Sequence, residues 1–246
     1  MMVKHVTKHI PFIWAHRGAS AVAPENTMAS FYAALHSGAN GIELDIHLSR
    51  DGIPVVIHDL SVDRTTNGQG LVAELTLREL QTLDAGHWFA PMFIGERIPT
   101  LFTVLERFSG RLRLNLEIKD AQAGLIAVEM LKDFPAADAL ISSFDWRLLV
   151  KIREVAPKIA LAVLLESQDW HFALSCINAI GASALHPRID RINKCLLLNC
   201  QRRDIAVSAW TVDDPRLVRR IVRQGINAVF CNNPGFVRES LVSRRF

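Results

Sequence analysis

Ionisable side chains stand where several apolar segments of the chain end. Glu43 and Asp45 are separated by one residue, and a β-strand, whose side chains alternate between faces, would direct both carboxylates to one side. Glu117 ends another apolar segment and supplies a third carboxylate. Oxygen ligands without cysteine thiolates suit a hard divalent cation, Mg²⁺ or Ca²⁺. Solvated strand ends are the alternative, but carboxylates that end an apolar strand are costly unless they bind something.

Two histidines and two cationic side chains accompany these carboxylates. His16 and His58 follow different apolar segments, and imidazole, which titrates near neutral pH, can act as a general acid or a general base. Arg17 offers a bidentate fork to phosphate oxygens and Lys119 offers a point charge. Pairing of both with the carboxylates is the alternative, which charge balance leaves open. A divalent cation, two histidines, an arginine and a lysine together indicate phosphoryl chemistry.

The segments that must position these residues alternate between β-rich and helical patterns along the whole chain. This alternation is typical of parallel strands joined by helical crossovers and predicts the α/β class. Helix starts are marked by Asn26 or Thr27, by Asp145, and by Asp213 with Pro215 in the first turn. The candidate strands are 12–16, 41–47, 53–58, 112–118, 139–143, 159–165, 182–186, 205–211 and 227–231.

The second and third candidate strands are too close together for a parallel connection, which needs about a dozen residues or more. Only residues 48–52 separate them, and Asp51-Gly52 predicts a two-residue type I′ hairpin turn. That turn places Asp45 opposite His58, with Cα atoms roughly 4.5–5.5 Å apart and side chains on one face. Without the returning strand, eight parallel strands remain, which is the number that closes a (β/α)₈ barrel of TIM type.

Catalytic side chains in such barrels come from the C-terminal ends of several strands, where the residues described above lie. We expect one barrel domain over residues 1–246, because single barrels of about 250 residues are common. Residues 60–99 are too many for a strand-to-helix loop and include a helical pattern at 75–83. They are predicted to form a small insertion at the barrel rim.

Composition and charge limit the partners and the location of the protein. Lys and Arg number 28 against 25 Asp and Glu, a formal charge of +3 that is too near balance for a dedicated nucleic-acid binder but permits an anionic small molecule. The four cysteines form no CxxC pair, which disfavours a structural zinc site and favours reduced thiols. No segment reaches the roughly 18 apolar residues that span a bilayer. We therefore expect a cytoplasmic protein without a stable membrane anchor.

Short motifs follow one another in a fixed order: HRGAS at 16–20, PENT at 24–27, GIELDIHLSRDGIPVVIHD at 41–59, DRTTNG at 63–68, LDAGHWF at 83–89, GERIPTL at 95–101, LEIK at 116–119, SSF at 142–144 and AWTV at 209–212. Each motif alone is weak, whereas the ordered set is specific. From about residue 16 to residue 234 the chain resembles the glycerophosphodiester phosphodiesterase family. The resemblance implies a phospholipase-C-like barrel that hydrolyses glycerophosphodiesters to sn-glycerol 3-phosphate and an alcohol, within glycerol and lipid metabolism.

The resemblance also implies roles for individual residues. His16 and His58 are the expected acid–base pair, and Arg17 and Lys119 are expected to contact phosphate. Trp210 is expected to face the glycerol moiety, with packing in the core as an equal rival. The implied metal ligands are Glu43, Asp45 and Glu117, and the implied supporting residues, unless they only cap the first helix, are Glu25 and Asn26.

The motifs contain no recognisable protein nucleophile, because no serine or cysteine adjoins either histidine in the sequence. The substrate offers the hydroxyl next to the phosphorylated carbon of glycerol. Attack by that hydroxyl, which gives a cyclic phosphate, is the favoured hypothesis, and attack by water is its rival.

Two other functions are considered. A lysophospholipase D-type enzyme on lipid substrates needs an apolar rim, for which residues 88–93 are the only candidate. A non-catalytic phosphodiester-binding barrel is expected to lack a histidine or a carboxylate, whereas the set is complete here. The sequence does not determine the preferred alcohol, the physiological cation or the oligomeric state.

Overall fold

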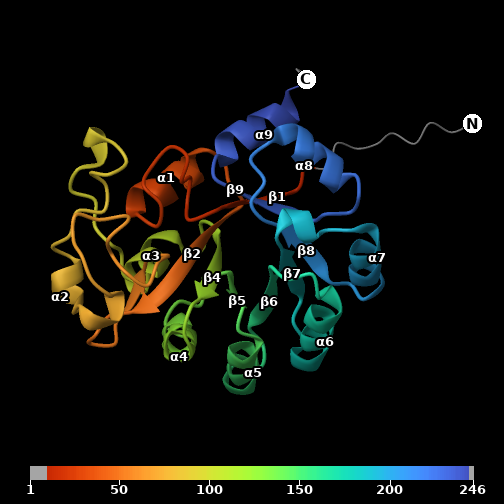
Figure 1. Ribbon diagram of the computed structural model, residues 1–246, viewed down its shortest axis with the longest axis horizontal. Helices are drawn as coiled ribbons and strands as arrows, with labels where there is room; N and C mark the ends of the chain where they lie inside the picture. The colour runs from red at the N-terminus through yellow and green to blue at the C-terminus, as the bar shows by residue number, and fades with distance from the viewer. Residues whose placement is uncertain (1–9, 244–246) are drawn as a thin grey trace, which may run out of the picture.

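Eight parallel strands close into a barrel surrounded by helices, which confirms the predicted α/β barrel (Figure 1). The computed structural model describes residues 10–243. The barrel closes because β1 pairs with β2 on one side and with β9 on the other. The parallel strands are β1 (Phe12–Ala15), β2 (Gly41–Leu48), β4 (Arg113–Ile118), β5 (Ala139–Ser143), β6 (Ala160–Leu165), β7 (Ala184–Pro187), β8 (Ala206–Ala209) and β9 (Ala228–Cys231).

Each surrounding helix is preceded by a capping residue, whose side chain accepts a hydrogen bond from a backbone N–H of the first turn. These N–H groups would otherwise lack partners. None of the helices within residues 10–243 is both long and apolar enough to cross a membrane. The surrounding helices are α1 (Met28–His36), α3 (Leu101–Phe108), α4 (Ala121–Leu131), α5 (Trp146–Val155), α6 (Trp170–Ile180), α7 (Lys194–Arg202), α8 (Pro215–Val222) and α9 (Pro234–Val242).

The cap of α1 is Thr27 and not Asn26. The Thr27 hydroxyl accepts a hydrogen bond from the backbone N–H of Ser30 at 3.3 Å. Asn26 has a φ of 55°, a left-handed conformation, and its amide donates to Asp45 instead. Asn26 is therefore free to support the site, because capping is done by its neighbour.

The cap of α8 is likewise shifted by one residue, from the predicted Asp213 to Asp214. Asp213 does not cap the helix, because its carboxylate accepts hydrogen bonds from Asn232 at the end of β9. The predicted cap of α5, Asp145, is confirmed.

The hairpin between β2 and β3 (Pro54–Val56) has a three-residue loop and not the predicted two-residue turn. The loop comprises residues 50–52 and ends at Gly52, whose φ of 77° is the left-handed conformation that such loops require. Asp45 consequently lies opposite Ile57. The predicted pairing of Asp45 with His58 is therefore wrong by one residue.

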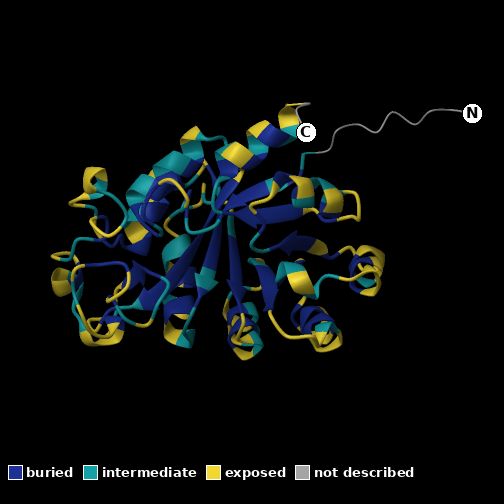
Figure 2. Ribbon diagram, turned by 45° about the horizontal axis from the view of Figure 1, so that its top comes forward, coloured by how far each residue is buried: buried dark blue, intermediate teal, exposed yellow. Residues whose placement is uncertain are grey.

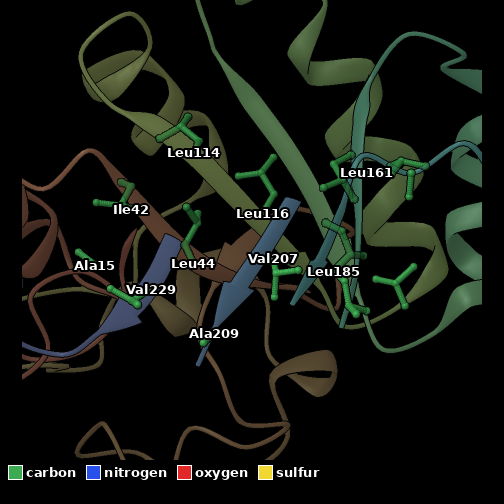
Figure 3. Close-up of a cluster of buried hydrophobic side chains, with 14 of the residues drawn as sticks. Ala15, Ile42, Leu44, Leu114, Leu116, Leu161, Leu185, Val207, Ala209 and Val229 are labelled. Atoms are coloured by element: carbon green, nitrogen blue, oxygen red, sulfur yellow. The ribbon is translucent and has the colours of Figure 1, made fainter. Parts of the chain in front are cut away.

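Apolar side chains of the barrel fill two separate spaces, one outside and one inside the ring of strands. The larger cluster lies between the strands and the helices, and Figure 3 shows members such as Leu44, Leu116 and Leu185. The smaller cluster consists of residues from the opposite faces of the strands, inside the barrel, where Trp14 and Phe230 stack with 5.8 Å between ring centroids. Figure 2 shows the strands buried and the outer helix surfaces exposed.

Residues 60–99 extend from the barrel beside β2 (Figure 1), and their apolar side chains form a cluster together with Val55 and Ile57 of the hairpin's returning segment. The helix predicted at 75–83 is shorter, because Thr76 caps its start and the hydrogen bonds of Thr82 and Leu83 run from residue i+3 to residue i. The assignment of the whole chain to one domain stays a prediction. The short elements of this segment are η1 (Val72–Glu74), α2 (Leu77–Leu80) and η2 (Pro91–Phe93).

Candidate active site

The carboxyl ends of the parallel strands surround a cavity of about 290 Å³. Most of the predicted site residues line it. Asp45, Glu25 and Asn26 do not, but they form hydrogen bonds or ion pairs with the rest of the set. The lining residues are His16, Arg17, Glu43, His58, Asn115, Glu117, Lys119, Phe144, Leu164, Glu166, Trp210 and Phe230.

Three carboxylates converge at this cavity. Strand β2 carries Glu43 and Asp45 on one face, and its parallel register with β4 places Asp45 beside Glu117. One oxygen from each side chain lies within 4.8 Å of the others. Burial first, and then the charges of Asp45 and Glu117, raise the pKa of Glu43 well above its usual value.

This acidic cluster fits a divalent cation. Glu43 Oε2 accepts a hydrogen bond from the backbone N–H of Arg17 at 2.8 Å, but Oε1 is buried and has no hydrogen-bond partner within residues 10–243. A buried carboxylate oxygen without a partner is costly. A hard cation that prefers oxygen ligands would satisfy it and reduce the repulsion among the three side chains.

Arg17 and Lys119 pair with the carboxylates and also line the cavity. Lys119 Nζ lies 2.9 Å from Asp45 Oδ1 and contacts Glu117 as well. Arg17 Nε lies 3.4 Å from Asp45 Oδ2. Burial raises the pKa of Asp45, but these two cations outweigh it and hold that pKa below its ordinary value. The two interactions considered from the sequence, carboxylate pairing and access to a ligand, are therefore compatible.

Glu25 and Asn26 orient the residues of the site. Glu25 accepts a hydrogen bond from Arg17 Nη1 at 2.8 Å and two more from Arg64. The Asn26 side chain donates from Nδ2 to Asp45 Oδ2 at 2.8 Å. Arg17 and Asn26 both have left-handed backbone conformations, with φ of 57° and 55°. Such conformations are costly for residues other than glycine and tend to occur at functional sites.

His16 follows β1 and is held by one hydrogen bond between side chains. Its Nδ1 lies 2.9 Å from Asn232 Oδ1. Burial first, and then the neighbouring Arg17 charge, lower the pKa of His16 below its ordinary value. The ring is therefore neutral at neutral pH, and its Nε2 is available to a ligand if Nδ1 carries the proton.

His58 lies beyond the end of β3, where the chain bends away from the sheet, and it still lines the cavity. Its Nδ1 lies 2.6 Å from Asp59 Oδ1. Hydrogen bonds from Arg64 are the main cause that lowers the pKa of Asp59 to about 2. Asp59 is therefore an ionised acceptor that holds the proton of His58 on Nδ1 and leaves Nε2 for substrate.

Trp210 lines the cavity and is also fixed in the barrel. Its Nε1 donates to the carbonyl oxygen of His186 at 2.7 Å, and its ring contacts Phe144 edge to face at 5.9 Å. The ring also packs against the apolar cluster inside the barrel. The two alternatives from the sequence, ligand contact and core packing, therefore apply to different parts of one side chain.

Several cavity residues were not identified from the sequence. Asn115 precedes Glu117 by two residues on the same face of β4, so the alternation that identified Glu43 could have found it. Phe144 is part of the SSF motif and directly follows β5. Glu166 ends β6 in the same way. Nothing in the sequence indicates that Phe230 lines the cavity, because an apolar residue in a strand is expected to pack in the core.

Comparisons with known proteins identify one family. The sequence model of the Glycerophosphoryl diester phosphodiesterase family matches residues 16–236. The glycerophosphodiester phosphodiesterase of Caldanaerobacter subterraneus subsp. tengcongensis is 37% identical over 233 residues, which cover 89% of this chain and 93% of the relative. The glycerophosphodiester phosphodiesterase of Bacillus subtilis is 31% identical over 245 residues, which cover 89% of this chain and 83% of the relative. A phosphodiesterase from Oleispira antarctica, solved in complex with the product sn-glycerol-3-phosphate, is 33% identical with a TM-score of 0.89, covering 95% of this chain and 98% of the other. The chain therefore belongs to the glycerophosphoryl diester phosphodiesterase family and is an enzyme of that kind.

Proposed function

We propose that the chain hydrolyses glycerophosphodiesters to sn-glycerol 3-phosphate and an alcohol in this cavity, using a divalent cation and two histidines. The observation that carries the proposal is the convergence of Glu43, Asp45 and Glu117 beside His16 and His58. The Oleispira antarctica relative, solved with sn-glycerol-3-phosphate as its product, supports the same product for this chain. A barrel that only binds phosphodiesters is disfavoured, because side chains for every chemical role are present.

Glu43, Asp45 and Glu117 would hold the cation, and their oxygen donors suit Mg²⁺ or Ca²⁺. A bound cation would supply positive charge that stabilises the negative charge developing on the phosphoryl group. Arg17 and Lys119 have more N–H donors than their ion pairs use, and both line the cavity. These two side chains therefore bind and orient the phosphate.

The two histidines move the protons. In the first step the 2-hydroxyl of the glycerol moiety attacks phosphorus, one histidine takes the hydroxyl proton, and the other gives a proton to the departing alcohol as its P–O bond breaks. Water then opens the resulting cyclic phosphate, with the two histidine roles reversed. Trp210, fixed edge to face against Phe144, gives the glycerol carbons an apolar wall.

The experiment that tests this proposal is an assay of glycerol 3-phosphate release, coupled to its dehydrogenase, from choline, ethanolamine and glycerol diesters. With Mg²⁺ or Ca²⁺ present we expect release from at least one of these substrates. Methyl p-nitrophenyl phosphate, which lacks glycerol, is the control diester and should be cleaved poorly. If no glycerophosphodiester yields product with either cation, the proposal is wrong.

Metal binding can be measured apart from activity. We expect Mg²⁺ or Ca²⁺ to raise the Tm of the wild type, because a ligand that binds only the folded state adds about 2.7 kcal/mol of stability at 100 times its Kd. Glu43→Gln removes the carboxylate whose Oε1 lacks a partner and should abolish most of this rise. Glu166→Gln, which changes a carboxylate in the same cavity but outside the cluster, should respond like the wild type. Equal rises in all three proteins would contradict the metal assignment.

The substrate is a small molecule, in keeping with the named activity of the relatives. A cytoplasmic location, no stable membrane anchor and no nucleic-acid partner remain part of the proposal. The location and partner proposals rest on the four cysteines, which are free thiols, and on the near balance of charge. The anchor proposal rests on the lack of a sequence segment with the roughly 18 apolar residues that span a bilayer.

A second candidate function is favoured by a mainly apolar groove of about 460 Å³ next to the cavity. The groove shares Phe144 with the cavity and continues to Trp146 and Phe172, whose rings contact edge to face at 5.8 Å. An acyl chain on the first hydroxyl of glycerol could run from the Trp210 wall across Phe144 into this groove. Residues 88–93 do not line it. The groove supports lysophospholipase D-type activity on 1-acyl substrates, whose free 2-hydroxyl retains the nucleophile.

Truncation of Phe172 tests the second function. Full burial of a phenylalanine side chain is worth about 1.5–3 kcal/mol, and Phe172→Ala removes part of such a contact. We therefore expect the variant to raise KM for a short-chain 1-acyl lysophosphatidylcholine roughly 5- to 10-fold and to leave KM for glycerophosphocholine unchanged. Phe236→Ala is the matched control, because both phenylalanines are 51% exposed and Phe236 lies outside the groove. If the acylated substrate is not cleaved, or if Phe172→Ala changes neither KM, the groove does not hold an acyl chain.

A further inference from the structure

We propose that Asp213 and Asn232 are positioning residues that fix His16 as the proton acceptor of the first step. The inference rests on the proposed function, since it assigns to one histidine the role that the reaction requires. It concerns two residues to which the sequence analysis gave no role in the reaction. Asp213 follows β8 and Asn232 follows β9, so neighbouring strands of the barrel bring them together.

The carboxylate of Asp213 holds Asn232 at two points. The backbone N–H of Asn232 donates to Asp213 Oδ1 at 2.6 Å, and the side-chain Nδ2 donates to Oδ2 at 2.7 Å. The side-chain amide of Asn232 is thereby oriented with its nitrogen toward Asp213 and its oxygen toward His16. The opposite orientation would place the amide oxygen against a carboxylate oxygen, which can only accept.

The amide orientation decides where His16 carries its proton. Asn232 Oδ1 lies 2.9 Å from His16 Nδ1 and also accepts from the hydroxyl of Ser20 at 3.0 Å. An amide oxygen only accepts hydrogen bonds, so the neutral ring must donate from Nδ1. Its lone pair is then on Nε2, the ring nitrogen left for substrate in the cavity that His16 lines.

The charge of the acceptor separates the roles of the two histidines, because both rings donate from Nδ1, His16 to the neutral amide of Asn232 and His58 to the carboxylate of Asp59. A neutral ring with its lone pair toward substrate can take the proton of the 2-hydroxyl. By elimination His58, whose Nδ1 faces the ionised Asp59, gives the proton to the departing alcohol. The chain from Asp213 through Asn232 to His16 therefore acts on the reaction without touching substrate.

The tautomer of His16 can be observed directly in the full-length protein. Long-range proton–nitrogen correlation spectra distinguish the two neutral forms, and the His16 signal is assigned by its loss in His16→Ala. We expect Nδ1–H alone in the wild type. In Asp213→Asn the new amide can pair with Asn232 in either orientation, so we expect a mixture of tautomers. Asp214→Asn makes the same charge change one residue away, at the cap of α8, and should leave the spectrum unchanged.

Kinetics then separate positioning from a structural role. Asp213→Asn should lower kcat about 10- to 100-fold, the range found for groups that orient a metal-ligating imidazole, whereas Asp214→Asn should keep the wild-type value. A glycerol p-nitrophenyl phosphodiester needs no acid for its leaving group. On this substrate His58→Ala should recover much of its lost rate, while His16→Ala and Asp213→Asn should not.

Each contrary result overturns the assignment. An Nε2–H tautomer in the wild type would remove the hydrogen-bond argument. A loss of kcat in Asp213→Asn without a tautomer change would indicate a structural role, and a tautomer change without a loss of kcat would show that positioning is irrelevant. Recovery of His16→Ala on the activated substrate would exchange the two histidine roles. The spectra need no substrate, so an inactive wild type would count against the proposed function and leave the tautomer test decisive.

Discussion

Replacing His16 or His58 with alanine is expected to lower kcat by about 10²–10⁴ for each lost proton transfer. Both rings line the cavity, and each has Nδ1 engaged by a neighbour, Asn232 or Asp59, so that Nε2 remains for substrate. Two proton transfers at one phosphorus require two groups, and neither histidine can replace the other in position. The measurement is steady-state kinetics on glycerophosphocholine with saturating cation.

The folded state should survive both substitutions, because the two histidines lie at the barrel mouth and belong to neither apolar cluster. Thermal denaturation should give Tm values close to that of the wild type. His36→Ala, which removes an exposed histidine from α1, is the matched control and should retain full activity. A variant of His16 or His58 that folds and turns over at the wild-type rate would demote that residue to a structural role.

A substrate analogue without the 2-hydroxyl is expected to bind but to turn over at least about 10³-fold more slowly. Intramolecular attack by a well-oriented hydroxyl has an effective molarity of roughly 10⁵–10⁸ M, and a hydrogen in its place removes that advantage. Binding should persist, because the phosphate contacts proposed for Arg17 and Lys119 do not involve the missing hydroxyl. The analogue should therefore act as a competitive inhibitor with a Ki near the KM of the natural diester.

Phosphorus NMR during single turnover of the natural diester provides the companion observation. A cyclic glycerol phosphate should appear before sn-glycerol 3-phosphate accumulates. Hydrolysis of the deoxy analogue at a rate close to that of the natural substrate would show that the internal nucleophile is wrong. Water would then be the attacking group, and one histidine would activate it.

The barrel and most of the site could be predicted because the relevant signals are local. Each parallel strand is a short apolar segment, and the carboxylates interrupt two of these segments, Glu43 and Asp45 within β2 and Glu117 near the end of β4. The period of two within β2 and β4 directs these carboxylates to one face of the strands, where they converge whatever the details of the loops. Strand identity and face therefore determine the acidic cluster.

Features that depend on one residue of register could not be predicted in the same way. Asp51-Gly52 suits both a two-residue turn and a three-residue loop, and the choice is made by where Gly52 adopts its left-handed conformation. Asn26 and Asp213 are good helix caps by residue type, but each forms a tertiary hydrogen bond and leaves the cap to its neighbour. Such competition between local and distant partners cannot be seen from residue type and spacing.

The most direct test of the account is turnover of a glycerophosphodiester by the purified protein after dialysis against excess EDTA. The cluster of Glu43, Asp45 and Glu117 would then hold mutually repulsive charges beside the phosphate, so glycerol 3-phosphate release should cease. Addition of Mg²⁺ or Ca²⁺ in excess over the chelator should restore it, while addition of Na⁺ at equal ionic strength should not. Full activity in the chelated, dialysed protein would contradict the central claim that this carboxylate cluster works through a divalent cation.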